Sequence, residues 1–247
     1  MNIAIITAIP EELKAVRAGL KATSAGIIQG ISVWHGTENS HQILATASGM
    51  GFENAGRCAA AVIRGWSPDL IISAGFCGGL SGELCVGDTV VATGLAIVAN
   101  GGAEDIPVPV PDACRNFVAR SCPEERLFGG FFVSTPKVIP KKQLAALFSQ
   151  SARHAVVEME SAAIGLVATE HRIPCAALRC VSDPLDEELL FSLDEFCDDT
   201  MTIRIPNVLL TCLKRPRIIP QLVRLAGNSR VAAASLTRSV RKFLETV

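Results

Sequence analysis

The chain has 247 residues, of which 49% are hydrophobic and 19% are charged, and its formal net charge is −1. This composition excludes an intrinsically disordered protein, and the length fits one large α/β domain or two small ones. No apolar run approaches the ~20 residues of a membrane span, and Glu11 and Glu12 interrupt the first run too early for a signal peptide. We therefore expect a cytoplasmic protein.

Cysteine and histidine spacing gives no sign of a metal site. The nine cysteines include no C-x-x-C pair, and only four histidines are scattered along the chain. A structural zinc site or a disulfide framework is therefore not expected. The nucleotide-binding motifs are also missing, because there is no P-loop and Asn54 breaks a G-x-G-x-x-G match. We expect no metal and no cofactor.

Short apolar runs alternate with segments of helical periodicity along the chain. In chain order they predict a strand over 2–8, a helix over Glu11–Leu20, strands over 31–36 and 42–47, a helix over Glu53–Arg64, a strand over 69–74, a turn and strand within 85–98, irregular structure over 100–125, a strand over 129–134, a helix over 141–150, a strand over 154–159, a helix over Glu160–His171 and a strand over 173–182. Several of these strands are apolar throughout, as in sheets that are covered on both faces. We therefore expect a three-layer α/β/α sandwich with a mixed, twisted central sheet over residues 1–212.

The last 35 residues, 213–247, differ from the rest in charge. They hold eight basic residues against Glu245 alone, a charge of +7, which leaves −8 on the first 212 residues. An acidic body argues against nucleic acid as a partner. The apolar positions among these cations follow an amphipathic pattern and are Val223, Leu225, Val231, Leu236, Val240, Phe243 and Leu244.

Two interpretations of this basic helical extension stay open. Composition alone favours a helix that is solvated on one side, and the alternative is a helix that lies on the anionic inner surface of a membrane. On the membrane interpretation, the protein is attached peripherally to that surface. Removal of residues 214–247 is then expected to leave activity on a small soluble nucleoside nearly unchanged.

Carboxylates follow three of the predicted strands. Glu11 and Glu12 follow the first strand, Glu158 and Glu160 bracket a later strand-to-helix junction, and Asp183 ends the last strand. Each alone is most simply a helix-capping acid. Because ligands gather at the carboxyl ends of strands in α/β sheets, three such junctions together indicate an acid/base site.

Four segments, Met1–Glu12, Ser48–Gly51, Gly75–Asp88 and Val157–Asp183, resemble the purine nucleoside phosphorylase and uridine phosphorylase superfamily. Within it, the V-E-M-E pattern and the downstream R-x-x-S-D resemble the methylthioadenosine/S-adenosylhomocysteine nucleosidases. The Ser-Asp-Pro sequence after the last strand and the basic tail also resemble the hopanoid-associated phosphorylases. Members of that branch are linked to removal of adenine from adenosylhopane, a lipid intermediate.

The resemblance implies a role for each matched residue. Asp183 matches the general acid that protonates purine N7, and Glu160 matches the carboxylate that binds the ribose 2′- and 3′-hydroxyls. Met159 would pack against the ribose. Glu12 matches the base that activates water, and Arg179 matches a residue that holds that water and Glu160, unless it only neutralises an acidic pocket.

Three positions depart from the nucleosidase pattern. Phe76 stands where the nucleosidases have a serine that contacts the nucleophile, and Val138 and Ile139 stand near their purine-stacking phenylalanine. Aliphatic packing would then replace stacking on the base. The other residues expected to line the substrate site are Ile9, Met50, Gly75, Glu158 and Ser182.

Water is the favoured nucleophile. Phosphorylases carry an arginine just before the glycine that matches Gly75, where this chain has Ala74, and their phosphate-binding N-terminal segment is replaced here by Glu11 and Glu12. Phosphate stays open as an alternative, with Arg120 or Arg153 as its cation. A non-catalytic nucleoside-binding protein of the same fold also stays open.

The resemblance implies a purine nucleoside as substrate, with adenine as the base and an apolar 5′ substituent. That substituent is either small, as in methylthioadenosine or S-adenosylhomocysteine, or a large lipid. The nucleosidase relatives are homodimers whose partner helps to close the 5′ side of the pocket. We expect a homodimer here as well, with the segment 100–125 as the contact.

Overall fold

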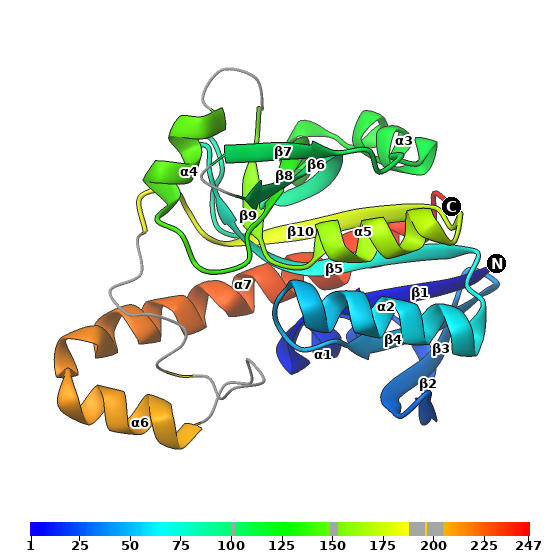
Figure 1. The fold of residues 1–247 in the computed structure, drawn as a ribbon, viewed down its shortest axis with the longest axis horizontal. Helices are drawn as coiled ribbons and strands as arrows, with labels where there is room; N and C mark the ends of the chain where they lie inside the picture. Colours follow the sequence, from blue (N-terminus) through cyan, green and yellow to red (C-terminus); the bar gives the residue numbers. More distant parts are fainter. Residues whose placement is uncertain (100–101, 149–152, 188–195, 197–204) are drawn as a thin grey trace.

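The computed structural model describes residues 1–99, 102–148, 153–187, 196 and 205–247 (Figure 1). Its strands are β1 (Asn2–Thr7), β2 (Lys21–Ile28), β3 (Ile31–Glu38), β4 (His41–Ala47), β5 (Leu70–Gly79), β6 (Thr89–Ala99), β7 (Gly102–Ile106), β8 (Leu127–Ser134), β9 (Val156–Glu158) and β10 (Cys175–Asp183). Its helices are α1 (Pro10–Ala18), α2 (Phe52–Trp66), α3 (Asp112–Arg120), α4 (Lys141–Phe148), α5 (Ser161–Glu170), α6 (Ile205–Lys214) and α7 (Ile219–Phe243), with 3₁₀ turns η1 (Pro123–Glu125) and η3 (Pro216–Ile218).

The strands form one mixed sheet in the order β10-β6-β8-β9-β5-β1-β4-β3-β2, with β7 paired to β6. Strand β1 runs parallel to both β4 and β5. Strand β10 pairs antiparallel with β6 and parallel with β5, so that β5, β9, β8, β6 and β10 close into a ring. The predicted mixed sheet is confirmed, and the closed ring is a feature that the sequence did not indicate.

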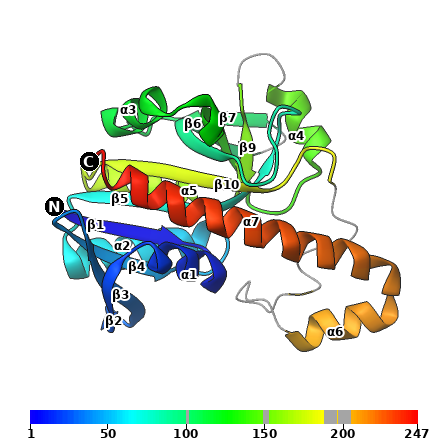
Figure 2. The ribbon, with the colours of Figure 1, turned by 180° about the vertical axis from the view of Figure 1, so that it is seen from behind.

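Helices cover both faces of the sheet, which confirms the three-layer architecture. Helices α2 and α5 lie side by side on one face, and α1 and α7 cover the other (Figures 1 and 2). Alternate residues of each strand face opposite layers. In β1, Ile3 and Ile5 join the core beneath α1 and α7, whereas Ala4 and Ile6 join the core beneath α2 and α5.

The prediction of irregular structure over 100–125 is wrong for the residues described there. This segment contains strand β7, helix α3 and the turn η1. Strand β7 is polar and exposed because it lies at the edge of the sheet and pairs with β6 alone, so it shows no apolar alternation. Helix α3 is short and buries only Cys114 and Phe117. Strand β2 was also not predicted, and residues 149–150 of the predicted helix 141–150 lie outside the described residues.

The second half of helix α7 belongs to the core. Leu236, Val240 and Phe243 are at most 1% exposed and pack with residues of β1, β5 and β10. The ring of Phe243 also meets that of Phe117 edge to face, with centroids 5.4 Å apart. The expectation that residues 214–247 can be removed without harm is therefore wrong, because removal would uncover one face of the sheet. The domain boundary after residue 212 stays a prediction.

Two valines of helix α7 allow a matched test of this packing. Val240 is 1% exposed and Val223 is 68% exposed. We expect Val240→Ala to lower the free energy of unfolding by about 1.5–3 kcal/mol, because it removes buried methyl groups and leaves a cavity. Val223→Ala should change it by less than about 0.5 kcal/mol. Urea denaturation of both variants measures the difference, and equal effects would show that α7 is not part of the core.

Candidate active site

The predicted acidic residues lie at the carboxyl ends of strands, as expected. Glu12 lies in the first turn of α1, directly after β1, and Glu158 and Glu160 lie between β9 and α5. Arg179 and Asp183 belong to β10. Because β1, β5 and β10 are parallel neighbours, they bring Glu12, Arg179 and Asp183 toward one edge of the sheet. Strand β9 pairs antiparallel with β5 and places Glu158 and Glu160 beside Arg179.

Glu12 is buried and held by three backbone N–H groups. Its Oε2 accepts hydrogen bonds from the N–H groups of Ala8 (2.8 Å) and Ile9 (3.1 Å), and its Oε1 accepts one from Phe76 (2.7 Å). A Cβ atom on Gly75 would lie 2.6 Å from Oε1. Glycine at position 75 is therefore what allows strand β5 to approach the carboxylate so closely.

Arg179 is the only cation among these groups in the described residues, and its side chain is 2% exposed. Its Nη2 atom lies 2.7 Å from Glu158 Oε2, 3.5 Å from Glu160 Oε2 and 3.2 Å from the hydroxyl of Ser73. Glu158, rather than the expected Glu160, is thus its main partner. The buried Nε of Arg179 has no hydrogen-bond partner in the described part of the chain. Burial raises the pKa of Glu12, while Arg179 acts in the opposite direction.

Glu158 and Glu160 are in different environments although both are buried. Glu158 accepts hydrogen bonds from the N–H groups of Glu160 (3.0 Å) and Ser161 (2.7 Å) and from the hydroxyl of Ser134. Burial opposes its charge, but the guanidinium and these donors lower the pKa of Glu158. Glu160 accepts from the N–H of Gly51 (2.9 Å), and burial together with the charge of Glu158 raises the pKa of Glu160 to about 7. Glu158 therefore carries the negative charge that pairs with Arg179, whereas the charged form of Glu160 is less favoured.

Asp183 lies in a second group farther along β10. Its Oδ1 accepts a hydrogen bond from the Ser182 hydroxyl (2.7 Å), and its Oδ2 accepts one from Lys141 Nζ (2.8 Å). Burial raises the pKa of Asp183, and the Lys141 ammonium acts in the opposite direction.

Sequence analysis missed Lys141. The segment 141–150 was predicted as a helix, and none of its side chains was singled out for the site. The signal that could have found it is its position, because a cation at a helix N-terminus opposes the helix dipole and indicates a partner elsewhere.

The remaining predicted residues fall into separate places. Met159 is half-buried, and its N–H lies 3.4 Å from Glu160 Oε2. Val138 is 43% exposed, and Ile139 packs against a small core cluster that includes Leu144. Their packing against the base therefore stays a prediction.

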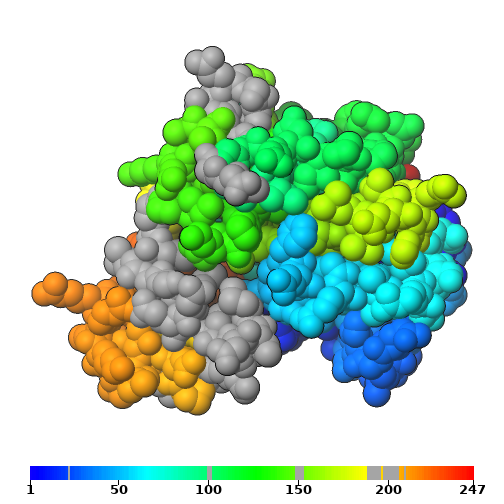
Figure 3. Space-filling model, viewed as in Figure 1, coloured from blue at the N-terminus to red at the C-terminus, as the bar shows by residue number. Residues whose placement is uncertain are grey.

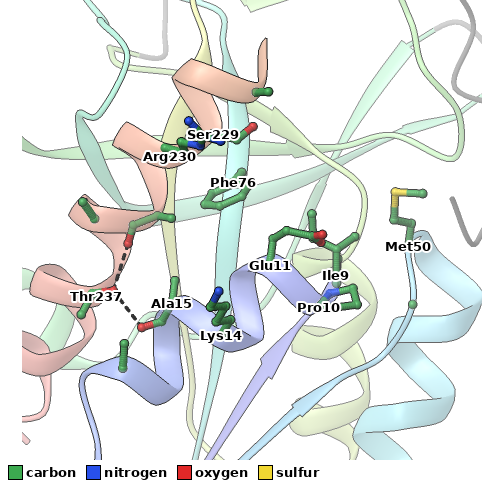
Figure 4. A pocket seen from close by; sticks show the side chains of 16 residues that line it. Ile9, Pro10, Glu11, Lys14, Ala15, Met50, Phe76, Ser229, Arg230 and Thr237 are labelled. Carbon is green, nitrogen blue, oxygen red and sulfur yellow. Dashed lines mark hydrogen bonds between the residues drawn. The ribbon is translucent and has the colours of Figure 1, made fainter. Parts of the chain in front are cut away.

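Ile9, Met50 and Phe76 line a cavity of about 810 Å³ between α1 and α7 (Figure 4). The Phe76 ring lies between α1 and the segment of α7 that carries Ser229 and Arg230. Most of the wall is apolar. The other lining residues are Ala8, Pro10, Glu11, Lys14, Ala15, Ala18, Gly49, Ala226, Ala233, Ala234 and Thr237.

The sequence profile of the phosphorylase superfamily matches residues 2–214, a range that includes Glu12, Glu158, Glu160, Arg179 and Asp183 but not the part of α7 that lines the cavity. The chain belongs to the phosphorylase superfamily. It is 27% identical over 218 residues to the 5′-methylthioadenosine/S-adenosylhomocysteine nucleosidase of Bacillus cereus, an alignment that spans 80% of this chain and 92% of that one.

Solved structures of other proteins have the same fold. The nucleosidase of Neisseria meningitidis in complex with methylthio-immucillin-A superposes with a TM-score of 0.75 at 20% identity, over 100% of this chain and 99% of that one. A mutant of the futalosine hydrolase of Helicobacter pylori gives a TM-score of 0.74 at 17% identity, over the whole of both chains. Within the described residues, no cluster of three His, Cys, Asp or Glu side chains could hold a metal ion.

The role expected of Glu160, binding the ribose diol, makes nucleoside binding depend on pH. A carboxyl group with a pKa of about 7 is protonated below that pH and becomes a full acceptor above it. We expect the affinity for a purine nucleoside with a C–C glycosidic bond to rise about tenfold from pH 6 to pH 8. Calorimetric titration measures this, and the 2′,3′-dideoxy analogue is the control that should show no such rise. An equal rise for both compounds would remove Glu160 from diol binding.

Proposed function

We propose that this protein is an N-glycosyl hydrolase that releases adenine from a nucleoside with an apolar 5′ substituent. The observation that carries this function is the buried cluster in which Arg179 faces Glu12, Glu158 and Glu160 at the strand ends. It supplies a base, an acceptor for the ribose and a fixed charge in one place. The names of the two nucleosidases described above support this reaction, and the name of the futalosine hydrolase supports hydrolysis.

The charge of the cluster favours water over phosphate as the nucleophile. Three carboxylates surround one guanidinium, and that guanidinium is already paired with Glu158. A phosphate dianion would be repelled, whereas water is neutral. Arg120 and Arg153, the two cations considered for phosphate, are both exposed. Glu12 is the base that takes a proton from water.

Cleavage needs a proton donor for the base and a partner for the sugar. Asp183 gives its proton to purine N7 as the bond between C1′ and N9 breaks, so that the base leaves neutral. Glu160 accepts hydrogen bonds from the ribose hydroxyls and faces the positive charge that develops on the sugar. Met159 lies next to Glu160 in the chain and packs against the ribose.

The cavity between α1 and α7 supports a bulky apolar 5′ substituent. It begins at Ile9, Met50 and Phe76, and the backbone N–H groups of Ile9 and Phe76 hold Glu12. From there it continues between α1 and α7. A volume of about 810 Å³ is far more than a methylthio group fills. Its apolar wall fits a long hydrocarbon, such as the lipid of an adenosylhopane-like substrate.

A series of 5′-alkylthioadenosines of increasing chain length tests this proposal. We expect adenine release without phosphate, and kcat/KM should increase about threefold or more per methylene until the cavity is filled, because each buried methylene contributes about 0.8 kcal/mol. Ala226→Trp should abolish the increase for long chains while sparing the methyl compound. Ala25→Trp, at an exposed site on β2 away from the cavity, is the control.

Three results would count against this proposal. Release that requires phosphate, with ribose 1-phosphate as the product, would make the protein a phosphorylase. Release of no adenine from any member of the series would leave a nucleoside-binding protein. A flat dependence on chain length, equal in both tryptophan variants, would remove the cavity as the 5′ site.

We also propose that the protein acts as a homodimer. Strand β7 leaves an exposed edge of the sheet within the segment 100–125, which is where we expect the partner. A second copy there would pair with an edge that is otherwise open to solvent.

We further propose that the protein attaches peripherally to an anionic membrane. The attachment involves the end of α6 and the start of α7 rather than the whole of 213–247. Helix α6 and the start of α7 project from the body, and side chains of α6 form a protruding corner in the space-filling view (Figures 1 and 3). Leu213 is 82% exposed and Ile219 is 43% exposed, with Lys214, Arg215 and Arg217 exposed between them. Apolar side chains among cations fit an interfacial position. No helix among the described residues is long and apolar enough to cross a bilayer.

Sedimentation with vesicles of anionic lipid tests this attachment at low salt. We expect the double substitution Leu213→Asp, Ile219→Asp to lower the partition coefficient more than tenfold, because each apolar side chain that enters the headgroup region contributes about 1.5–3 kcal/mol. Ile27→Asp is the matched control, since Ile27 is 77% exposed on β2. The attachment would be refuted if the wild-type protein did not sediment with the vesicles. It would also be refuted if Ile27→Asp lowered the partition coefficient as much as the double substitution does.

A further inference from the structure

Lys141 has no part in the reaction as described so far, yet it is the closest cation to Asp183. Its side chain is 6% exposed, and Nζ lies 2.8 Å from Asp183 Oδ2. The same ammonium donates to the backbone carbonyl groups of Asp183 (3.4 Å) and Pro184 (2.5 Å). These bonds join the start of α4 to the end of β10.

Strand β5 leaves room for this pair through Gly78. A Cβ atom there would lie 3.0 Å from Asp183 Oδ2 and 3.2 Å from Lys141 Cδ. Both groups would have to shift to make space for it. The ammonium and the carboxylate are therefore packed against backbone, and neither can swing away without breaking a hydrogen bond.

Lys141 is unfavourably placed for the stability of its own helix. As the first residue of α4 it puts a positive charge at the positive end of the helix dipole. Burial adds a desolvation penalty, which an ion pair offsets only in part. The Asp183 carboxyl, 2.8 Å from Nζ, is a partner that accounts for a buried lysine at this position.

We propose that Lys141 is a positioning residue that makes Asp183 a stronger acid toward the departing base. When the bond between C1′ and N9 breaks, its electron pair goes to the purine, and the proton of Asp183 moves from oxygen to N7. Asp183 is left as a carboxylate, and the ammonium 2.8 Å away stabilises that charge. The role rests on the proposed function, because it acts through the proton donor of that reaction.

Leaving groups of different quality separate this role from a structural one. 2-Fluoroadenine is a better leaving group than adenine, because fluorine withdraws electrons. Cleavage of its nucleoside therefore depends less on proton donation by Asp183. For Lys141→Met we expect kcat on the adenine nucleoside to fall about 10- to 100-fold, below the ~10²–10⁴-fold that general acids supply. The 2-fluoro substrate should fall less, so that the ratio of the two rates rises at least threefold. KM should change little.

Three further variants complete the test. Lys141→Arg keeps the positive charge and should restore most of the rate, whereas Lys141→Gln keeps a donor without the charge and should behave like Lys141→Met. Lys141→Gln also serves if Lys141→Met does not fold, as judged by thermal unfolding. Lys142→Met, at the exposed neighbouring position, should match wild type.

The rate ratio decides the outcome. Equal losses on both substrates, or failure of Lys141→Arg to recover, would overturn the role of Lys141. Wild-type protein that releases neither base would instead refute the proposed function. These two failures are therefore distinguishable.

Discussion

The buried charge of Arg179 is the constraint on which this end of the sheet depends. A guanidinium at 2% exposure would be strongly unfavourable alone, because desolvation of an ion costs several kcal/mol. Glu158 compensates it at 2.7 Å, and Glu158 is fixed in turn by Ser134 and by the first N–H groups of α5. Arg179 thereby allows the two further carboxylates, Glu12 and Glu160, to be buried beside it. Without that cation the three acids would repel one another.

The closed ring of strands explains how a strand as short as β9 can hold the ion pair of Glu158 and Arg179 in place. Strand β9 has three residues, yet it pairs with β8 on one side and β5 on the other. Its register sets Glu158 opposite Ser134, which donates to its carboxylate. If β9 lay at the edge of the sheet, only one neighbouring strand would hold the backbone near Glu158. In the ring, β5 and β8 pair with β9 on both sides.

The sequence predicted the sheet and the acids because both leave local signals. Apolar runs marked β1, β5, β8 and β10, and the acids followed strand ends. What could not be predicted were the partners, since Glu158 and Arg179 lie 21 residues apart and Lys141 and Asp183 lie 42 apart. A pattern within one helix or strand carries no information on such pairs. Strand β7 was missed because an exposed edge strand needs no apolar face.

Helix α7 shows the same limit in another form. Its amphipathic pattern predicted that one side would be apolar, but not what would cover that side. In the structure the covering changes along the helix: Leu236 and Phe243 meet the sheet, and Ala226 and Ser229 line the cavity. One amphipathic pattern therefore covers both the sheet and the cavity. Which residues meet which of the two depends on the path of the helix across the sheet, and this path cannot be read from the pattern.

Helix α1 forms one wall of the cavity and also carries a group of the reacting centre. Lys14, Ala15 and Ala18 face the cavity, and Glu12 in the same nine-residue helix is fixed by backbone N–H groups from two strand ends. A movement of α1 that widened the cavity for a larger substrate would therefore also displace the Glu12 carboxylate. Substrate range in this scaffold should evolve, and be engineered, on the opposite wall, where α7 contributes mostly small side chains and no group of the reacting centre.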